Sequence, residues 1–84
     1  MELRHLRYFV AVAEELSFTK AARRLRLAQP SLTRQIKNLE EEIGVELFER
    51  ANNRITLTEP GRRFLFDGKN LLAMAARMWP PCSE

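Results

Sequence analysis

A one-sided distribution of charge is the most chemically informative feature of this sequence. Between Glu15 and Glu40 no acidic side chain occurs, yet the window contains Lys20, Arg23, Arg24, Arg26, Arg34 and Lys37. Directly after it the balance reverses, with Glu40, Glu41, Glu42, Glu46 and Glu49. A surface of one sign repels itself, so it is easier to maintain when a polyanion neutralises it. We interpret the basic window as a surface that faces the phosphates of a nucleic acid.

Two amphipathic segments carry these charges. The apolar spacing predicts a short helix over residues 18–25 and a longer helix over residues 29–43, joined by a tight turn at residues 26–28. Gly44 ends the second helix. The buried stripe of this second helix consists of Leu32, Ile36, Leu39 and Ile43. This arrangement is typical of a helix-turn-helix, in which the second helix enters the major groove of DNA.

The exposed face of the predicted second helix has side chains that can read base pairs. When the stripe faces inward, helical rotation predicts an opposite face that consists of Pro30, Thr33, Arg34 and Lys37. The exposed N-terminal end of the helix consists of Gln29 and Ser31. Arginine can pair bidentately with guanine and glutamine with adenine, threonine and proline can touch a thymine methyl, and lysine suits a phosphate. The alternative is an ordinary amphipathic helix whose polar face is solvated.

The start of the short helix can add phosphate ligands. The hydroxyls of Ser17 and Thr19, together with the free backbone N–H groups of a helix N-terminus, can bind a phosphate. A role for Ser17 as a helix cap alone is equally open. Arg23 or Arg24 can contact DNA or pair with an acidic neighbour, and the sequence does not separate these roles.

Segments on either side complete a winged fold. Steps of three and four residues predict a first helix over residues 2–15, with a buried stripe of Leu3, Leu6, Phe9, Val10, Ala13 and Leu16. Residues 45–50 and 54–57 alternate apolar and polar side chains on either side of a turn at residues 51–53, Ala-Asn-Asn, which predicts a two-stranded hairpin. Arg50 and Arg54 bracket its tip, where arginines can enter a minor groove. A solvated hairpin is the alternative.

A long last helix is predicted from Glu59 to about Met78, with Thr58 as its cap and Pro60 in its first turn. Two heptad rows and the small residues between them form an apolar stripe wider than the small core needs: Phe64, Leu65, Gly68, Leu71, Leu72, Ala75, Met78 and Trp79. We expect this stripe to pair two chains about a twofold axis, so that two second helices face two half-sites. The alternative is that the stripe packs only on its own domain.

The composition argues against several other functions. The 84 residues suffice for one small domain, and the net charge is +3. One histidine, His5, and one cysteine, Cys82, provide no nucleophile–base pair and no metal cluster, so we expect no enzymatic activity, no metal and no cofactor. The sequence start lacks the apolar segment of a signal peptide, and no apolar run approaches the ~20 residues that cross a bilayer. We expect a soluble cytoplasmic protein without a membrane partner.

The order and spacing of these residues match a known protein family. The match is dense over residues 2 to about 66 and rests on Leu3–Phe9, Ser17–Ala22, Leu25, Gln29–Ile36, Leu39, Glu40, Gly44–Arg50, Leu57, Thr58 and Gly61. In these features the sequence resembles the N-terminal domain of LysR-type transcriptional regulators. The resemblance implies a mostly α fold, a winged helix-turn-helix with a two-stranded wing and a long linker helix that pairs two chains. It implies a homodimer on an interrupted palindrome in double-stranded promoter DNA, with Gln29, Pro30, Ser31, Thr33 and Arg34 reading the groove.

The resemblance also implies a domain organisation. Residues 1–58 would form the DNA-binding domain, residues 59–79 the linker and dimerisation helix, and residues 80–84 a tail towards an effector-binding domain that this sequence lacks. A small-molecule effector would act only through that domain, and the intact protein would be a dimer or a tetramer. Ala28 departs from the family, which usually has Ser or Thr there as a helix cap. A winged-helix module that docks on protein instead of DNA is the alternative function.

Overall fold

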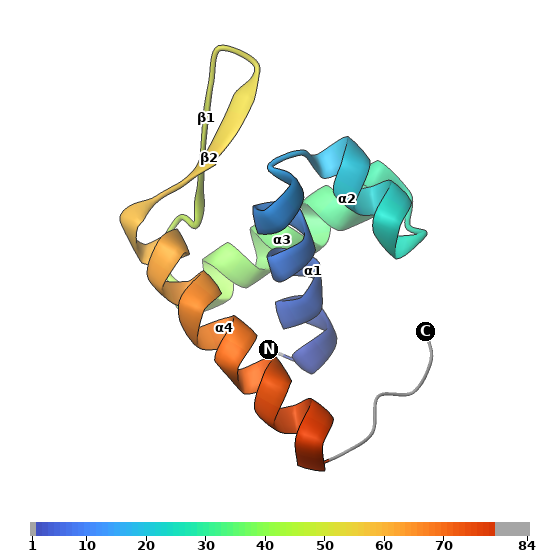
Figure 1. Ribbon diagram of the computed structural model, residues 1–84. Coiled ribbons are helices and arrows are strands. Elements are labelled where there is room, and N and C mark those ends of the chain that lie inside the picture. The colour runs from blue at the N-terminus through green and yellow to red at the C-terminus, as the bar shows by residue number, and fades with distance from the viewer. Residues whose placement is uncertain (1, 79–84) are drawn as a thin grey trace.

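The computed structural model describes residues 2–78, which form four helices and one two-stranded antiparallel sheet (Figure 1). The elements are, in chain order, α1 (Leu3–Glu15), α2 (Phe18–Leu25), α3 (Gln29–Ile43), β1 (Phe48–Ala51), β2 (Arg54–Leu57) and α4 (Glu59–Met78). This order confirms the mostly α winged helix-turn-helix fold expected from the sequence. Within residues 2–78, no helix combines the length and the apolar character that crossing a membrane requires.

The core lies where α1, α2 and α3 meet, and an aromatic cluster extends it to the wing and to α4. Phe9 on α1 is fully buried, and its ring centroid lies 5.3 Å from that of Phe48 and 5.0 Å from that of Phe64. Tilted and edge-on ring pairs at such distances stabilise a fold beyond the apolar area that they bury. Phe9 therefore joins α1 to the first wing strand and to α4 at the same time.

The apolar stripe predicted for α1 is wrong at its two ends. Leu16 follows the last helical residue and has a left-handed backbone, with φ of 49°. This conformation takes its side chain off the buried face of the helix, and Leu16 is 47% exposed. Leu3, the first helical residue, is 42% exposed. The members between them that are buried are Leu6, Phe9, Val10 and Ala13.

The helix-turn-helix forms as the sequence predicts. The hydroxyl of Ser17 accepts a hydrogen bond from the backbone N–H of Lys20 at 3.1 Å, which confirms Ser17 as the N-cap of α2. Arg26 then takes a left-handed backbone, with φ of 59°, and ends α2. Leu27 is half-buried against the core. The turn therefore brings α3 across α2 with an apolar side chain beneath it.

The wing projects beyond the helices (Figure 1) and is shorter than predicted. Ala51 pairs with Arg54, so the turn consists of Asn52 and Asn53, which have φ of 53° and 60°. Two left-handed residues form the tight turn that matches the twist of a hairpin, and asparagine tolerates this conformation. The predicted first strand began at residue 45 and is wrong in its first three residues, because the backbone of Leu47 forms hydrogen bonds outside the ladder.

Two glycines let α4 approach the rest of the domain closely. A methyl group at Gly61 would overlap the carbonyl oxygen of Leu47. At Gly68 it would lie 2.9 Å from Cδ1 of Leu6, on α1. The sequence reasoning assigned Gly68 to close approach between two chains, but the structure places α1 of the same chain there. The hydroxyl of Thr58 accepts a hydrogen bond from the backbone N–H of Gly61 at 3.0 Å, which confirms the predicted cap.

Candidate nucleic-acid interface

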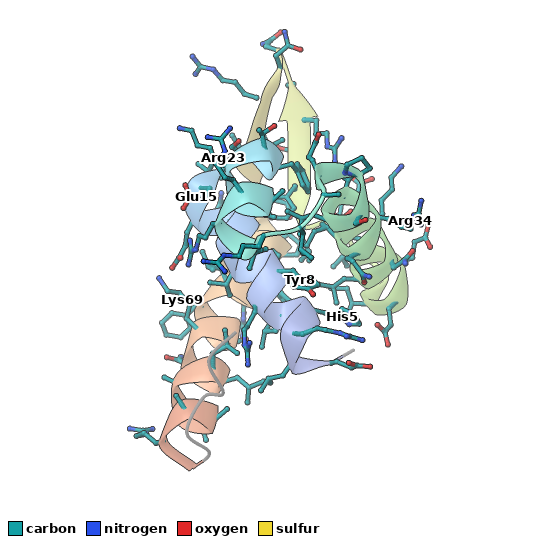
Figure 2. The ribbon with its side chains drawn as sticks, turned by 90° about the vertical axis from the view of Figure 1, so that its right-hand side faces the viewer. His5, Tyr8, Glu15, Arg23, Arg34 and Lys69 are labelled. Carbon is teal, nitrogen blue, oxygen red and sulfur yellow. The ribbon has the colours of Figure 1, made fainter. Side chains whose placement is uncertain are left out.

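The outer face of α3 is exposed along its N-terminal half. Leu32, Ile36 and Leu39 are buried on the inner face. Figure 2 shows Arg34 on the outer side of α3, pointing away from the other helices. Arg34 and Lys37 form no ion pair with another residue in the described part of the chain. The exposed members of the predicted reading set are Gln29, Pro30, Ser31, Arg34 and Lys37.

Thr33 differs from the other predicted reading residues. It is half-buried, and its hydroxyl donates a hydrogen bond to the backbone oxygen of Gln29 at 3.0 Å. Rotation by about 100° per residue places Thr33 beside the buried stripe instead of opposite to it. The sequence reasoning placed it on the outer face, and this is a correction.

The N-terminus of α3 has no side-chain cap. Ala28 takes the N-cap position, with φ of −70° and ψ of 137°, and forms no side-chain hydrogen bond there. Pro30 in the first turn has no N–H to satisfy, so part of the cost of an open N-terminus is avoided. Because alanine has no side-chain acceptor, the backbone N–H groups of the first turn of α3 donate no hydrogen bond to the side chain of the N-cap residue.

Replacing Ala28 with serine is expected to raise the free energy of unfolding by about 1 kcal/mol, because its hydroxyl can accept a hydrogen bond from the first turn of α3. Urea unfolding, with the midpoint compared at unchanged slope, measures the gain. Ala28→Val is the matched control, because it adds a side chain without an acceptor. A gain of the same size in both variants would contradict the capping explanation.

A cleft separates α3 from the wing. It has a volume of about 270 Å³ and is lined by Phe18, Thr33, Ile36, Lys37, Glu40, Glu46, Phe48 and Arg50. The cleft brings together three of the predicted site residues, Thr33 and Lys37 of α3 and Arg50 of β1. Cations from two different elements therefore stand on the walls of one cleft beside the exposed face of α3.

The two wing arginines have different surroundings. The guanidinium carbon of Arg50 lies 4.7 Å from the centroid of the Phe18 ring, a distance typical of a cation–π contact. Phe18 is the first residue of α2, so this contact ties the wing to the helix-turn-helix. Arg54 is exposed on the other side of the turn. A second hollow, lined by Phe18 and residues 50–55, lies between them.

The two hydroxyl residues at the start of α2, Ser17 and Thr19, have different surroundings. Ser17 is half-buried and uses its hydroxyl as a cap, whereas Thr19 is exposed. Arg24 forms ion pairs with Glu14 at 2.9 Å and with Glu15 at 3.2 Å. Arg23 is exposed on α2 (Figure 2). Of the two arginines that the sequence could not separate, Arg24 is therefore the one that pairs with acidic neighbours.

Glu14 connects three helices through its ion pairs. It accepts a hydrogen bond from Arg24 on α2 and lies 3.2 Å from the ammonium of Lys69 on α4. The hydrogen bond from Arg24, with a further one from Lys69, holds the pKa of Glu14 below its usual value against the opposing effect of burial. A carboxyl group whose pKa is lower in the folded state than in the unfolded state stabilises the fold at pH values above its unfolded-state pKa. This contribution is lost as the pH falls through the folded value.

Glu40 has a role that the sequence reasoning missed. By sequence it belongs to an acidic triplet, Glu40–Glu42, whose charge predicts that this end of the helix stays away from phosphates. Instead Glu40 is half-buried, and its Oε2 accepts hydrogen bonds from the backbone N–H groups of Leu47 at 2.7 Å and Phe48 at 3.2 Å. Its partners are backbone N–H groups, which almost every residue has, so no residue type in the sequence points to them. The only signal is the position of Glu40 on the flank of α3 next to the buried stripe.

The structure divides the predicted dimerisation stripe of α4. Phe64, Leu65 and Leu72 are half-buried against the core of their own domain, and Ala75 is half-buried. Leu71 is 47% exposed, and the neighbouring Met74, which was not predicted, is 50% exposed. Met78 ends α4, and Trp79 lies outside the described residues. The part of the stripe open to a second chain is therefore the flank that carries Leu71 and Met74.

Known proteins share this sequence and shape. Residues 3–62 match the family described as bacterial regulatory helix-turn-helix proteins of the lysR family. The chain is 62% identical over 65 residues to the transcriptional regulator AlsR of Bacillus subtilis, covering 77% of this chain and 22% of AlsR. It is 55% identical over 78 residues to the regulator BenM of Acinetobacter baylyi, covering 93% of this chain and 26% of BenM.

Solved structures agree with this match. A crystal structure of the BenM DBD in complex with catB site 1 DNA superposes with a TM-score of 0.90 at 55% identity, covering 93% of this chain and 84% of that one. A CbnR DBD–DNA complex superposes with a TM-score of 0.88 at 46% identity, covering 93% and 90%. The chain spans only about a quarter of the length of regulators such as BenM, at 26%. By sequence and by shape, this chain belongs to the LysR family of bacterial helix-turn-helix regulatory proteins.

Proposed function

We propose that this chain is the DNA-binding domain of a transcriptional regulator and binds double-stranded promoter DNA sequence-specifically as a homodimer. α3 lies in the major groove with its N-terminal half towards the bases, and the wing reaches the adjacent minor groove. The observation that carries the proposal is the exposed face of α3 from Gln29 to Lys37, which has no acidic side chain and adjoins a cleft where Lys37 of α3 faces Arg50 of the wing. Its role is binding, not catalysis.

The relatives support this proposal independently of the charge pattern. BenM and AlsR are transcriptional regulators, and the superposed BenM and CbnR domains are DNA complexes. The alternative, a winged-helix module that docks on protein, needs an apolar surface on α3. The large side chains on the outer face of α3 are polar or charged, which favours DNA over an apolar partner.

The geometry suggests a division of roles among the site residues. Arg34 reads guanine and Gln29 adenine, while Pro30 and the methyl group of Thr33 contact thymine methyls. Lys37 and Arg50 face the phosphates of the strand that runs through the cleft, and Arg54 enters the minor groove. The exposed hydroxyl of Thr19 at the start of α2 binds a phosphate, the exposed hydroxyl of Ser31 faces the groove, and Ser17 acts mainly as a cap.

Selection from a pool of random duplexes, followed by titration at several salt concentrations, tests this function. We expect enrichment of one half-site sequence in two copies related by a twofold axis. We also expect log affinity to fall steeply with log salt, because each neutralised phosphate releases counterions. No enrichment and no binding at low salt by a confirmed dimer would reject the proposal in favour of the protein-docking alternative.

We extend the proposal to the assembly of the intact protein. The flank of α4 that carries Leu71 and Met74 pairs two chains, and the chain continues after α4 into a larger domain that binds a small-molecule effector. This domain organisation is consistent with relatives of which the chain spans only about a quarter, 26% for BenM. The regulator acts in the cytoplasm, where promoter DNA is accessible.

Replacing Leu71 with glutamate is expected to convert the dimer to a monomer, because two carboxylates would be buried without partners at the twofold contact. Affinity for the two-half-site duplex should fall about a hundredfold, since the gain from linking two binding events is lost. Sedimentation and DNA titration measure the two effects. Phe66→Glu is the matched control, because Phe66 is 68% exposed and helical rotation places it about 140° around α4 from Leu71. A Leu71→Glu variant that still sediments as a dimer would reject this interface.

A further inference from the structure

The wing is attached to the body of the domain at its base. On one side the Glu40 carboxylate of α3 accepts hydrogen bonds from the backbone N–H groups of Leu47 and Phe48. On the other side Thr58 donates from its backbone N–H to the oxygen of Leu47 at 3.0 Å and from its hydroxyl to the oxygen of Glu46 at 2.6 Å. The base of β1 is therefore fixed to α3 through Glu40 and to the start of α4 through Thr58.

The position of the wing tip depends on this base. A strand rises by about 3.3 Å per residue, so a rotation of about 15° at Phe48 would move the backbone of Arg54 by roughly 3 Å. Such a shift exceeds the range over which a hydrogen bond keeps its strength. Along the strand, Phe48 contacts the rings of Phe9 and Phe18 and Arg50 lies over Phe18, which leaves the turn and Arg54 beyond these contacts.

We propose that Glu40 is a positioning residue for DNA binding: its carboxylate sets the angle between the wing and α3, so that Arg50 reaches the phosphates and Arg54 the minor groove while α3 occupies the major groove. This inference rests on the proposed function. Glu40 itself does not touch DNA. It acts through the backbone of Leu47 and Phe48, and its negative charge beside Lys37 and Arg50 in the cleft serves the wing as a hydrogen-bond acceptor.

One geometric detail separates this role from a simple charge effect. Both backbone N–H groups donate to the same oxygen, Oε2. A glutamine at this position keeps one such oxygen on a side chain of the same length, so Glu40→Gln should retain both hydrogen bonds. Glu40→Ala removes the acceptor, and Glu40→Asp keeps the charge but shortens the reach. All changes that neutralise this charge would by themselves favour DNA binding, because they remove repulsion from phosphates.

The distance between the wing and α3, measured without DNA, tests the geometry. Nitroxide labels at Asn38→Cys and Ala51→Cys, in a Cys82→Ser background, report this distance by pulsed electron paramagnetic resonance. We expect a narrow distribution for the parent chain and for Glu40→Gln, and a broadened or shifted one for Glu40→Ala and Glu40→Asp. If Glu40→Ala does not fold, as judged by circular dichroism, Glu40→Asp carries the test. An unchanged distribution, or equal broadening in Glu40→Gln, would overturn the inference.

DNA titration then connects the geometry to function. We expect Glu40→Ala to bind the selected duplex about tenfold more weakly and with a salt slope reduced by about one to two, since the wing arginines no longer engage. Glu40→Gln should bind at least as tightly as the parent chain. Glu41→Ala, which removes an exposed charge one residue later, is the matched control and should not weaken binding. Equal weakening in Glu40→Gln and Glu40→Ala would overturn the inference.

The two measurements also distinguish this inference from the proposed function. If the parent chain binds no duplex, the proposed function fails, whereas the distance distributions still decide whether Glu40 sets the wing. If the parent chain binds DNA and Glu40→Ala keeps its minor-groove footprint and its salt slope, the proposed function stands and the positioning role is rejected. A double variant, Glu40→Ala with Arg54→Ala, should bind no more weakly than Glu40→Ala alone, because Glu40→Ala already removes the contact of Arg54.

Discussion

Replacing Arg34 with alanine is expected to weaken binding to the selected duplex by about 1–3 kcal/mol per half-site, and by about 2–6 kcal/mol for a dimer on two half-sites. Arg34 is exposed on the outer face of α3 and has no acidic partner in the described chain. A guanidinium that forms two hydrogen bonds with one guanine leaves both acceptors unpaired when it is removed. The loss should therefore be confined to one base pair per half-site. Titration against the duplex and its single-base variants measures it.

Arg77→Ala provides the charge-matched control for Arg34. Arg77 is exposed in the last turn of α4. This C-terminal end of α4 is the end far from the wing (Figure 1). Its removal should lower affinity slightly and equally for all sequences, because it changes only the general field of the protein. Equal, sequence-independent losses in the two variants would show that Arg34 contributes only charge, and its reading role would be rejected.

Replacing Phe9 with alanine is expected to lower the free energy of unfolding by about 3–5 kcal/mol. Phe9 is fully buried and contacts the rings of Phe48 and Phe64, so the truncation opens a cavity between α1, the wing and α4. A domain of this size has a total stability of about 5–10 kcal/mol, so the variant should be near the limit of folding. Urea unfolding followed by circular dichroism measures the change.

Phe66 offers the same truncation at an exposed position. It is 68% exposed on α4, so Phe66→Ala should change the free energy of unfolding by no more than about 0.5 kcal/mol. The comparison isolates burial, because the two substitutions remove the same atoms. Similar losses at Phe9 and Phe66 would contradict the core described above.

Local signals explain why the sequence predicted the helices well. Ser17 predicts the start of α2 and Gly44 the end of α3, since a cap and a left-handed glycine act on their own helix. The stripe of α3 also predicted the burial of Leu32, Ile36 and Leu39, because helical rotation is regular, whereas Ile43 in the last turn is only half-buried. The polar outer face followed from the same rotation, and only Thr33, at the border of the stripe, was placed wrongly.

Contacts between distant residues could not be predicted in this way. The hydrogen bonds from the backbone of residues 47 and 48 to Glu40 depend on how the wing meets α3, and they shorten the first strand. The burial of Gly68 under Leu6 depends on how α4 crosses α1, and a heptad pattern does not tell an intrachain partner from a second chain. The stacking of Arg50 on Phe18 likewise joins residues far apart in the sequence.

The most direct test of the account asks whether α3 reads base edges in the major groove. Replacing each guanine of the selected half-site in turn with 7-deazaguanine removes the N7 acceptor and leaves base pairing and the minor groove intact. We predict that one such replacement weakens binding of the parent chain and has no effect on Arg34→Ala. If no replacement weakens the parent chain, or if both proteins respond alike at every guanine, then Arg34 does not read the major groove and the assignment of α3 is contradicted.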